Sequence, residues 1–95
     1  MGIVAAWHSL TYVQVASSVP KQKGVYELAD SRRATIYIGQ SIDLNSQLQT
    51  LLNTNDPLWR HAANFRFELT SWPHQRRREL LDEYFQKHGR YPPCN

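Results

Sequence analysis

Two tyrosines on neighbouring β-type segments are the residues in this chain best suited to chemistry. Tyr26 lies in a β-rich run from Val25 to Leu28, and Tyr37 lies in a second such run from Thr35 to Ile38. If both side chains point to one sheet face, their hydroxyls converge and can accept a proton or orient a water molecule near a phosphate. The alternative is that both rings only pack a half-buried sheet face, which the strand preference of tyrosine would explain.

Basic residues form the second feature with chemical potential. Arg76, Arg77 and Arg78 are consecutive at the start of a predicted helix and could contact phosphates. The charge near the first β-type runs comes from Lys21, Lys23, Arg32 and Arg33. The alternative is a set of solvated surface charges, because a run of three is short and a net charge of +3 is common in small proteins. None of the four histidines has a partner at i+3 or i+4 for a metal, so we treat them as structural.

The elements that carry these residues can be predicted from the period of the apolar positions. The runs Val25–Leu28 and Thr35–Ile38 form a plausible hairpin, after a leading segment with a short helix or strand between Leu10 and Ser18. From Ser41 the leucines recur at helical spacing, which predicts about three turns of helix with Ser41 or Asp43 as the cap. Pro57 is expected to open a short helical turn that reaches His61.

The second half of the chain predicts one more strand and one more helix. Phe65, Phe67 and Leu69 alternate with polar residues, which is typical of a strand with one buried and one wet face. From His74 to His88 an apolar stripe has helical spacing, and Gly89 is well placed to end the helix. The members of the stripe are Leu80, Leu81, Tyr84, Phe85 and His88. The order strand, strand, helix, strand, helix favours an α+β fold with a small antiparallel sheet.

Composition indicates one small folded domain. The chain has 95 residues, of which 41% are hydrophobic and 12% are aromatic, so we expect a single domain over residues 1–95, with residues 1–20 as an N-terminal extension packed on it. Cys94 has no other cysteine to pair with, which excludes an internal disulfide and favours a reducing, cytoplasmic setting. The apolar stretch from Gly2 to Val19 is interrupted by polar residues and is short for a bilayer span, so no membrane role is expected.

Gly24-Val25-Tyr26, followed by Tyr37-Ile38-Gly39, resembles the paired tripeptides of the GIY-YIG nuclease family. The turn after Gly39 and the segment from Glu83 to Asn95 resemble further parts of the family pattern, so the resemblance spans most of the chain. It implies a three-stranded antiparallel sheet flanked by helices, with Gly24, Gly39 and Asn95 as structural motif residues. It also implies a metal-dependent DNA endonuclease that uses Mg²⁺ or Mn²⁺ at a single site.

Roles in the site follow from the resemblance. Glu83 matches the family glutamate that holds the metal, and Glu79, one turn earlier, is the second choice. A single glutamate is chemically reasonable, because magnesium usually takes one or two protein carboxylates and keeps several waters. Tyr26 is the better candidate for the general base, and Tyr37 is a supporting hydroxyl. For Glu83 the alternative is an ordinary solvated helix carboxylate.

Two positions depart from the family pattern. Gln47 occupies the helix position where the family carries its catalytic arginine, and glutamine cannot offset the charge that builds on a phosphate. Gln40 follows the motif glycine, where a lysine or a similar residue is common. Either the site is impaired or another cation replaces the arginine. The candidates are Arg60, Arg76, Arg77 and Arg78, and with Lys23 and Gln40 they are also the expected contacts to DNA.

Three functions from different classes remain open at this level. The first is a DNA endonuclease. The family includes repair, intron-homing and junction nucleases, which usually gain specificity from attached domains, so we expect this short chain to gain it from DNA shape, from self-association or from a partner protein. The second is an inactive module that binds nucleic acid or a protein, with Gln47 marking the loss of catalysis. The third is an interaction protein unrelated to DNA, with Trp7, Trp59 and Trp72 as interface anchors.

Overall fold

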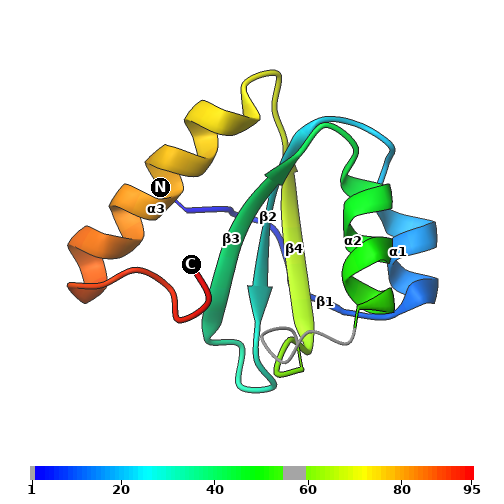
Figure 1. Ribbon diagram of the computed structural model, residues 1–95, viewed down its shortest axis with the longest axis horizontal. Coiled ribbons are helices and arrows are strands. Elements are labelled where there is room, and N and C mark those ends of the chain that lie inside the picture. Colours follow the sequence, from blue (N-terminus) through cyan, green and yellow to red (C-terminus); the bar gives the residue numbers. More distant parts are fainter. Residues whose placement is uncertain (1, 55–59) are drawn as a thin grey trace.

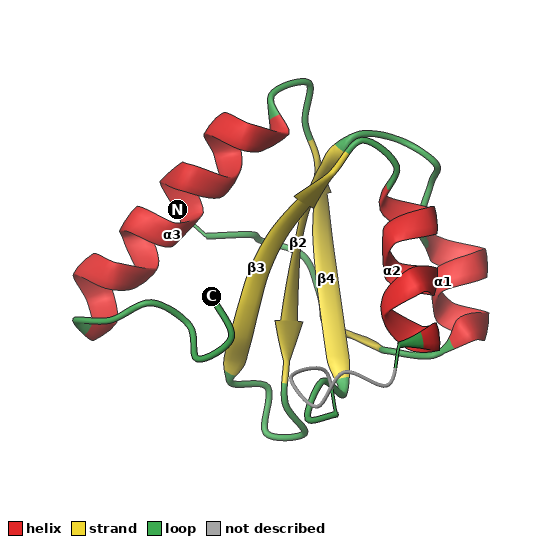
Figure 2. Ribbon diagram, in the orientation of Figure 1, coloured by secondary structure: helices red, strands yellow, loops and turns green. Residues whose placement is uncertain are grey.

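The computed structural model describes residues 2–54 and 60–95, and shows an antiparallel sheet between two helical layers (Figure 1). The elements in chain order are β1 (His8–Ser9), α1 (Tyr12–Ser18), β2 (Gly24–Ala29), β3 (Thr35–Ser41), α2 (Leu44–Asn53), β4 (Asn64–Leu69) and α3 (Pro73–His88). Helices α1 and α2 lie side by side on one side of the sheet, and α3 lies on the other (Figure 2). Among the described residues, no helix has the length and apolarity needed to cross a bilayer.

The sheet has the strand order β1-β4-β2-β3, and every pairing is antiparallel. β2 pairs with both long neighbours, and all six of its residues are buried. Successive residues of a strand point to opposite faces, so β2 supplies a core residue to each side in turn. Tyr26 and Leu28 point to α1 and α2, whereas Val25 and Glu27 point to α3.

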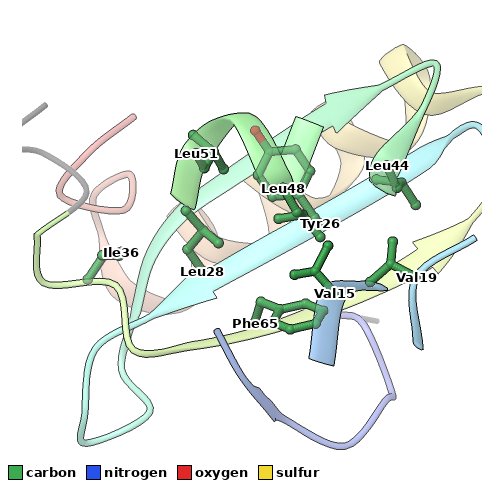
Figure 3. Close-up of a cluster of buried hydrophobic side chains, with 9 residues drawn as sticks. All are labelled: Val15, Val19, Tyr26, Leu28, Ile36, Leu44, Leu48, Leu51 and Phe65. Carbon is green, nitrogen blue, oxygen red and sulfur yellow. The ribbon is translucent and has the colours of Figure 1, made fainter. Parts of the chain in front are cut away.

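The larger apolar core lies between the sheet and the pair α1 and α2 (Figure 3). Tyr26 and Leu28 of β2 meet Leu44 and Leu48 of α2 there, and Phe65 of β4 closes the cluster. The leucines recur at helical spacing, so one face of α2 is apolar and packs on the sheet. At the start of α2 the side chain of Asp43 accepts a hydrogen bond from the Ser46 backbone N–H, and this cap fixes where the helix begins.

The second face of the sheet combines a small apolar cluster with partly buried ion pairs. Ile3, Val25, Ile38 and Leu80 form the apolar part beneath α3. Arg66 of β4 donates to Glu27 of β2 at 2.5 Å, directly across the strand pair. Nearer the start of α3, Arg76 clamps Glu68 with bonds of 2.7 and 3.2 Å, which ties the helix to β4. The polar side chains on this face of β4 are therefore half-buried and paired, so the face is less wet than the alternation predicts.

Most of the expected elements are confirmed. The hairpin, the helix after it, the third long strand and the last helix all occur, and the leading segment forms the helix α1. The prediction of a three-stranded sheet is wrong by one strand, because β1 adds a two-residue edge strand to β4. The turn predicted from Pro57 begins outside the described residues.

The apolar stripe of α3 is narrower than its sequence suggests. Only Leu80 is buried, with Leu81 and Tyr84 packed at the edge of the cluster. Phe85 and His88 are exposed, although both have the right spacing. The last turns of α3 extend past the sheet, where Phe85 packs on Tyr91 of the chain end, and Gly89 closes the helix with a φ of 73°.

Replacing Gly24 with alanine is expected to lower the free energy of unfolding by about 1–3 kcal/mol. A Cβ there would lie 2.4 Å from the carbonyl oxygen of Glu68 and 2.7 Å from a methyl group of Leu44, so backbone would have to move. Urea denaturation at equilibrium measures the loss. Gly2→Ala is the control, because a Cβ at Gly2 meets nothing within 4 Å. Equal stability of the two variants would contradict the tight packing of β2 on β4.

Candidate functional site

Tyr26 and Tyr37 lie on the same face of the β2–β3 hairpin. Tyr26 faces Gly39 across the strand pair, and Leu28 faces Tyr37, so both rings point towards α2. The ring centroids are 6.0 Å apart, with a tilt of 40° between the planes. A Cβ at Gly39 would lie 2.5 Å from both the Cζ and the hydroxyl oxygen of Tyr26. Only glycine at this position lets the Tyr26 ring extend across β3, so the motif glycine is a steric requirement of the tyrosine.

The Tyr26 hydroxyl is hydrogen-bonded to Gln47, the residue at which the sequence departs from the family pattern. Gln47 reaches it from the first turns of α2, and the Gln47 amide Nε2 donates to the Tyr26 hydroxyl at 3.4 Å. Gln47 is half-buried there. An arginine at this position would therefore point its charge at the two tyrosines, whereas glutamine offers one neutral donor.

Arg77 approaches the same place from α3. Its Nε donates to the backbone carbonyl of Ile38 at 3.3 Å, and its charge is close enough to Tyr26 to favour the ionised phenol. Arg66 and Arg76 differ from Arg77 because each of them binds a carboxylate. Arg66 bonds Glu27, and Arg76 bonds Glu68. Arg77 bonds a neutral carbonyl, so this hydrogen bond does not offset its positive charge, and the carboxylate of Asp82 lines the same groove as Arg77.

Asn95 forms hydrogen bonds with the edge of β3 at Ile38, the residue that Arg77 also binds. Its side-chain amide donates to the Ile38 carbonyl at 2.9 Å, and its side-chain oxygen accepts from the Ile38 N–H at 2.9 Å. The Cys94 N–H donates to the Ile36 carbonyl at 2.8 Å. The chain end thus satisfies an edge that would otherwise be unpaired, and it fixes the backbone to which Arg77 binds.

The pKa of Tyr26 is raised well above that of an ordinary tyrosine. The main cause is burial, because the side chain is only 2% exposed and the phenolate would lose its water. The neighbouring Tyr37 raises the pKa further, whereas the Gln47 hydrogen bond and the Arg77 charge act in the opposite direction. In this arrangement Tyr26 is a neutral hydroxyl that can donate and accept hydrogen bonds.

Glu83 lies on the other face of the sheet, in the α3 layer. It is half-buried and lines a cavity of about 200 Å³ with Ile38, Glu27, Thr35 and Arg66. The side chain of Ile38 lines this cavity, while its backbone bonds Arg77 and Asn95 at the edge of β3. Glu83 and the tyrosines therefore approach β3 from opposite faces.

The cavity beside Glu83 has room and one half-buried carboxylate for a divalent cation. Among the described residues, no group of three or more histidine, cysteine, aspartate or glutamate side chains could hold a metal. Glu27 is committed to Arg66 and to the Thr35 hydroxyl, each at 2.5 Å. A partly hydrated magnesium ion needs only one or two carboxylates and room for its waters, which Glu83 and the cavity can supply.

The pairing of Glu27 with Arg66 was missed by the sequence reasoning. The pair is part of a larger network, because the Arg66 guanidinium lies 4.1 Å from the centre of the Trp7 ring and donates to the Ala5 carbonyl at 3.5 Å. The sequence offers two hints of this pair: a glutamate within the apolar run of β2, and an arginine among the alternating residues of β4. That the two residues lie opposite each other could be predicted only if the order of the strands in the sheet were known.

The other predicted contacts to DNA are distributed over different parts of the molecule. Arg76 forms ion pairs with Glu68 and Glu79, and this pairing raises its pKa. Arg78 is exposed and lines the same groove as Arg77 and Asn95, together with Asp82 and Tyr91. Arg60 lies at the opposite end of the sheet, beside Asp30. Lys23 and Gln40 lie at the end where β2 starts and β3 finishes.

Comparison with protein families gives one match. Residues 1–87 match the family described as "Domain of unknown function (DUF7508)". The comparison with curated proteins found no match.

Solved structures with the same fold include several of one nuclease domain. The GIY-YIG N-terminal endonuclease domain of UvrC from Thermotoga maritima, bound to magnesium, superimposes with a TM-score of 0.63 at 20% identity, over 87% of this chain and 92% of that chain. A tyrosine-to-phenylalanine point mutant of that domain, bound to its catalytic divalent cation, gives 0.63 at 19% identity, over 88% and 93% of the chains. An asparagine-to-alanine mutant gives 0.63 at 18%, over 87% and 91%. The chain therefore has a GIY-YIG-like α+β fold.

The buried Tyr26 hydroxyl predicts a loss of stability in alkali. Above pH 10.0, the ordinary pKa of tyrosine, the unfolded chain releases this proton while the folded protein keeps it, so unfolding is favoured as the pH rises. Tyr26 should contribute up to about 1.4 kcal/mol per pH unit to this decline. Tyr26→Phe should remove its share, measured by urea denaturation from pH 9 to 11. Tyr91→Phe, at an exposed tyrosine, is the control, and identical slopes for wild type and Tyr26→Phe would refute the prediction.

Proposed function

The chain belongs to the family described as "Domain of unknown function (DUF7508)" and has a GIY-YIG-like fold, and from this premise we propose that it is a divalent-metal-dependent DNA endonuclease. The observation that carries the proposal is the meeting of Tyr26, Tyr37, Gln47 and Arg77 at one point of β3. Two hydroxyls, an amide and a cation that binds a neutral carbonyl are suited to a phosphate and its attacking water. The magnesium-bound UvrC domain supports the choice of reaction class and cation.

Tyr26 and Tyr37 handle the attacking water in this proposal. The raised pKa of Tyr26 argues against a resting tyrosinate, so Tyr26 orients the water through its neutral hydroxyl. Tyr37 is hydrogen-bonded to Tyr26 and only half-buried, which gives the proton a path towards solvent. Gln47 holds the Tyr26 hydroxyl in place by donating to it.

Glu83 holds the cation. A bound divalent ion would neutralise charge on the phosphate and assist the leaving oxygen. Glu83 is well suited to this task because it is half-buried at the wall of a cavity on the β3 side of α3. Asn95 contributes indirectly, since it fixes the backbone of Ile38 between the two halves of the site.

Arg77 takes the role of the arginine that Gln47 replaces. It lies beside Tyr26 and is bonded to a neutral carbonyl, so its guanidinium retains donors and charge for a phosphate oxygen. The other candidates are less suitable. Arg76 is paired with two glutamates, and Arg60 lies at the far end of the sheet.

Cleavage of supercoiled plasmid and of branched and single-stranded DNA in Mg²⁺ and Mn²⁺ at low salt tests the proposal. The native chain should nick DNA, and Glu83→Ala and chelation by EDTA should each abolish the nicking. Arg77→Ala should reduce the rate by about 10²- to 10³-fold, because it removes charge stabilisation in a preorganised site. Arg90→Ala, the same charge change at an exposed position after α3, should leave the rate unchanged.

Gln47 favours a second candidate, a module that binds nucleic acid without cutting it. Gln47→Arg separates the two, since its side chain would reach Tyr26. If the native chain does not cleave DNA and Gln47→Arg does, the scaffold is intact and catalysis was lost at this position. If neither chain cleaves any of the substrates, the nuclease proposal is overturned.

A further inference from the structure

A surface with exposed apolar side chains lies at the end of the sheet where β2 begins and β3 and β4 finish. Ile42 is 81% exposed, Trp72 is 72% exposed and Leu69 is 45% exposed. They line two adjoining hollows of about 490 and 540 Å³, which share Ile42 and Ser71. In Figure 1 this is the end at which the loop into α3 and the loop into α2 lie near each other. Apolar side chains that are exposed together in one patch, with polar residues around them, mark an interaction site more often than single exposed residues do.

The lining of the two hollows is neutral or basic. Lys21 and Lys23 lie on one side, and His74 lies beyond Trp72. Amide side chains come from Gln22, Gln40 and Gln75, and none of the described residues that line either hollow is acidic. The surface therefore combines an exposed indole, apolar walls, hydrogen-bonding amides and positive charge.

This combination fits single-stranded nucleic acid better than a protein or a duplex. An unpaired base has a free aromatic face that can stack on an indole, and its flanking phosphates need cations within reach. In a duplex the base faces are stacked on one another, so they are not available to Trp72. The amides can bond base edges without requiring a particular sequence.

The surface is continuous with the proposed catalytic residues. Gln40 lines one hollow and directly follows Gly39, whose backbone supports the Tyr26 ring. Pro73 lines the same hollow and opens α3, which carries Arg77 one turn further on. A strand that lies across the surface would therefore lead to the edge of β3.

We propose that the surface formed by Lys21, Lys23, Gln40, Ile42, Leu69 and Trp72 binds an unpaired segment of DNA, with a base stacked on Trp72 and phosphates on the lysines. The inference deepens the proposed function and rests on it for the identity of the ligand as DNA. It makes unpaired DNA, as found at junctions, flaps or frayed ends, the preferred substrate class.

Fluorescence anisotropy with a short labelled oligothymidylate tests the inference, in EDTA so that no cleavage occurs. Trp72→Ala should raise the dissociation constant about 5- to 100-fold, and Trp72→Phe should restore part of the affinity because a smaller ring still stacks. The side chain is largely exposed and its backbone bonds to Thr70 and Arg76 do not depend on it, so the variants should fold. Phe85→Ala, at an exposed aromatic residue far along α3, is the matched control.

Charge is tested separately from stacking. Changing Lys21 and Lys23 together to glutamine should reduce the slope of log affinity against log salt by about 1.4, as expected for the loss of two phosphate contacts to a single strand. A blunt duplex of the same sequence length, without unpaired ends, should bind more weakly than the oligothymidylate and should respond less to Trp72→Ala.

Two results would overturn the inference. Equal affinity of wild type and Trp72→Ala for the oligothymidylate would exclude stacking on Trp72. A dimer in sedimentation velocity that Trp72→Ala dissociates, with oligothymidylate affinity unchanged, would make the surface an interface between two copies of the chain. Because these measurements need no metal, Trp72-dependent binding without any nicking would support this inference while the nuclease proposal fails.

Discussion

The burial of β2 on both faces is the constraint on which the rest of the structure depends. A central strand in an antiparallel sheet usually alternates between a core face and a wet face, but every residue from Gly24 to Ala29 is buried here. The strand must therefore supply two cores with one alternating sequence. Tyr26 and Leu28 serve one core, and Val25 and Glu27 serve the other. A shift of the register by one residue would exchange the tyrosine and the glutamate between the two faces.

Placing a charged residue in the second core makes a compensating charge necessary. Glu27 is buried, and an unpaired carboxylate there would be costly, so Arg66 is required opposite it on β4. The same layer then holds a second arginine–glutamate pair, Arg76 with Glu68, between the helix and the strand. The face of the sheet under α3 is consequently more polar than the face under α2. A partly hydrated cation beside Glu83 would therefore have a more polar environment than one on the α2 face.

Much of the fold could be predicted from the sequence, because the signals that specify it are local. The period of Leu44, Leu48 and Leu51 shows a helix, and the alternation from Phe65 shows a strand. The edge strand β1 could not be predicted, since two residues carry no periodicity. They pair with β4 only because the N-terminal segment lies alongside that strand in the fold. The face of β4 that was expected to be wet is only partly exposed, for a related reason. Alternating polar residues look the same whether they meet water or a buried partner, and Arg66 and Glu68 meet partners.

The candidate site was predictable in type but not in arrangement. The motif tripeptides identify Tyr26, Tyr37 and Gly39, yet nothing in the spacing shows that the tyrosine ring rests against the glycine. Arg77 was one of four candidates by sequence, with Arg60, Arg76 and Arg78. It could not be distinguished from Arg76 and Arg78, because the three differ only in their direction around a helix. Successive residues of a helix point about 100° apart, so one faces Glu68, the next faces the β3 edge and the third faces solvent.

The position of Arg77 also bears on why glutamine can be accommodated at residue 47. An arginine in α2 would point at the Tyr26 hydroxyl, and the charge of Arg77 in α3 also acts on that phenol, so the two like charges would repel each other unless an anion lay between them. With glutamine in α2, the guanidinium of Arg77 remains, held by the carbonyl of Ile38. In the proposed nuclease this arrangement avoids the repulsion, but a bound phosphate would lack the cation from α2. Such a site would bind and polarise a phosphate less strongly than one with both arginines, which makes slow turnover the natural consequence of this exchange.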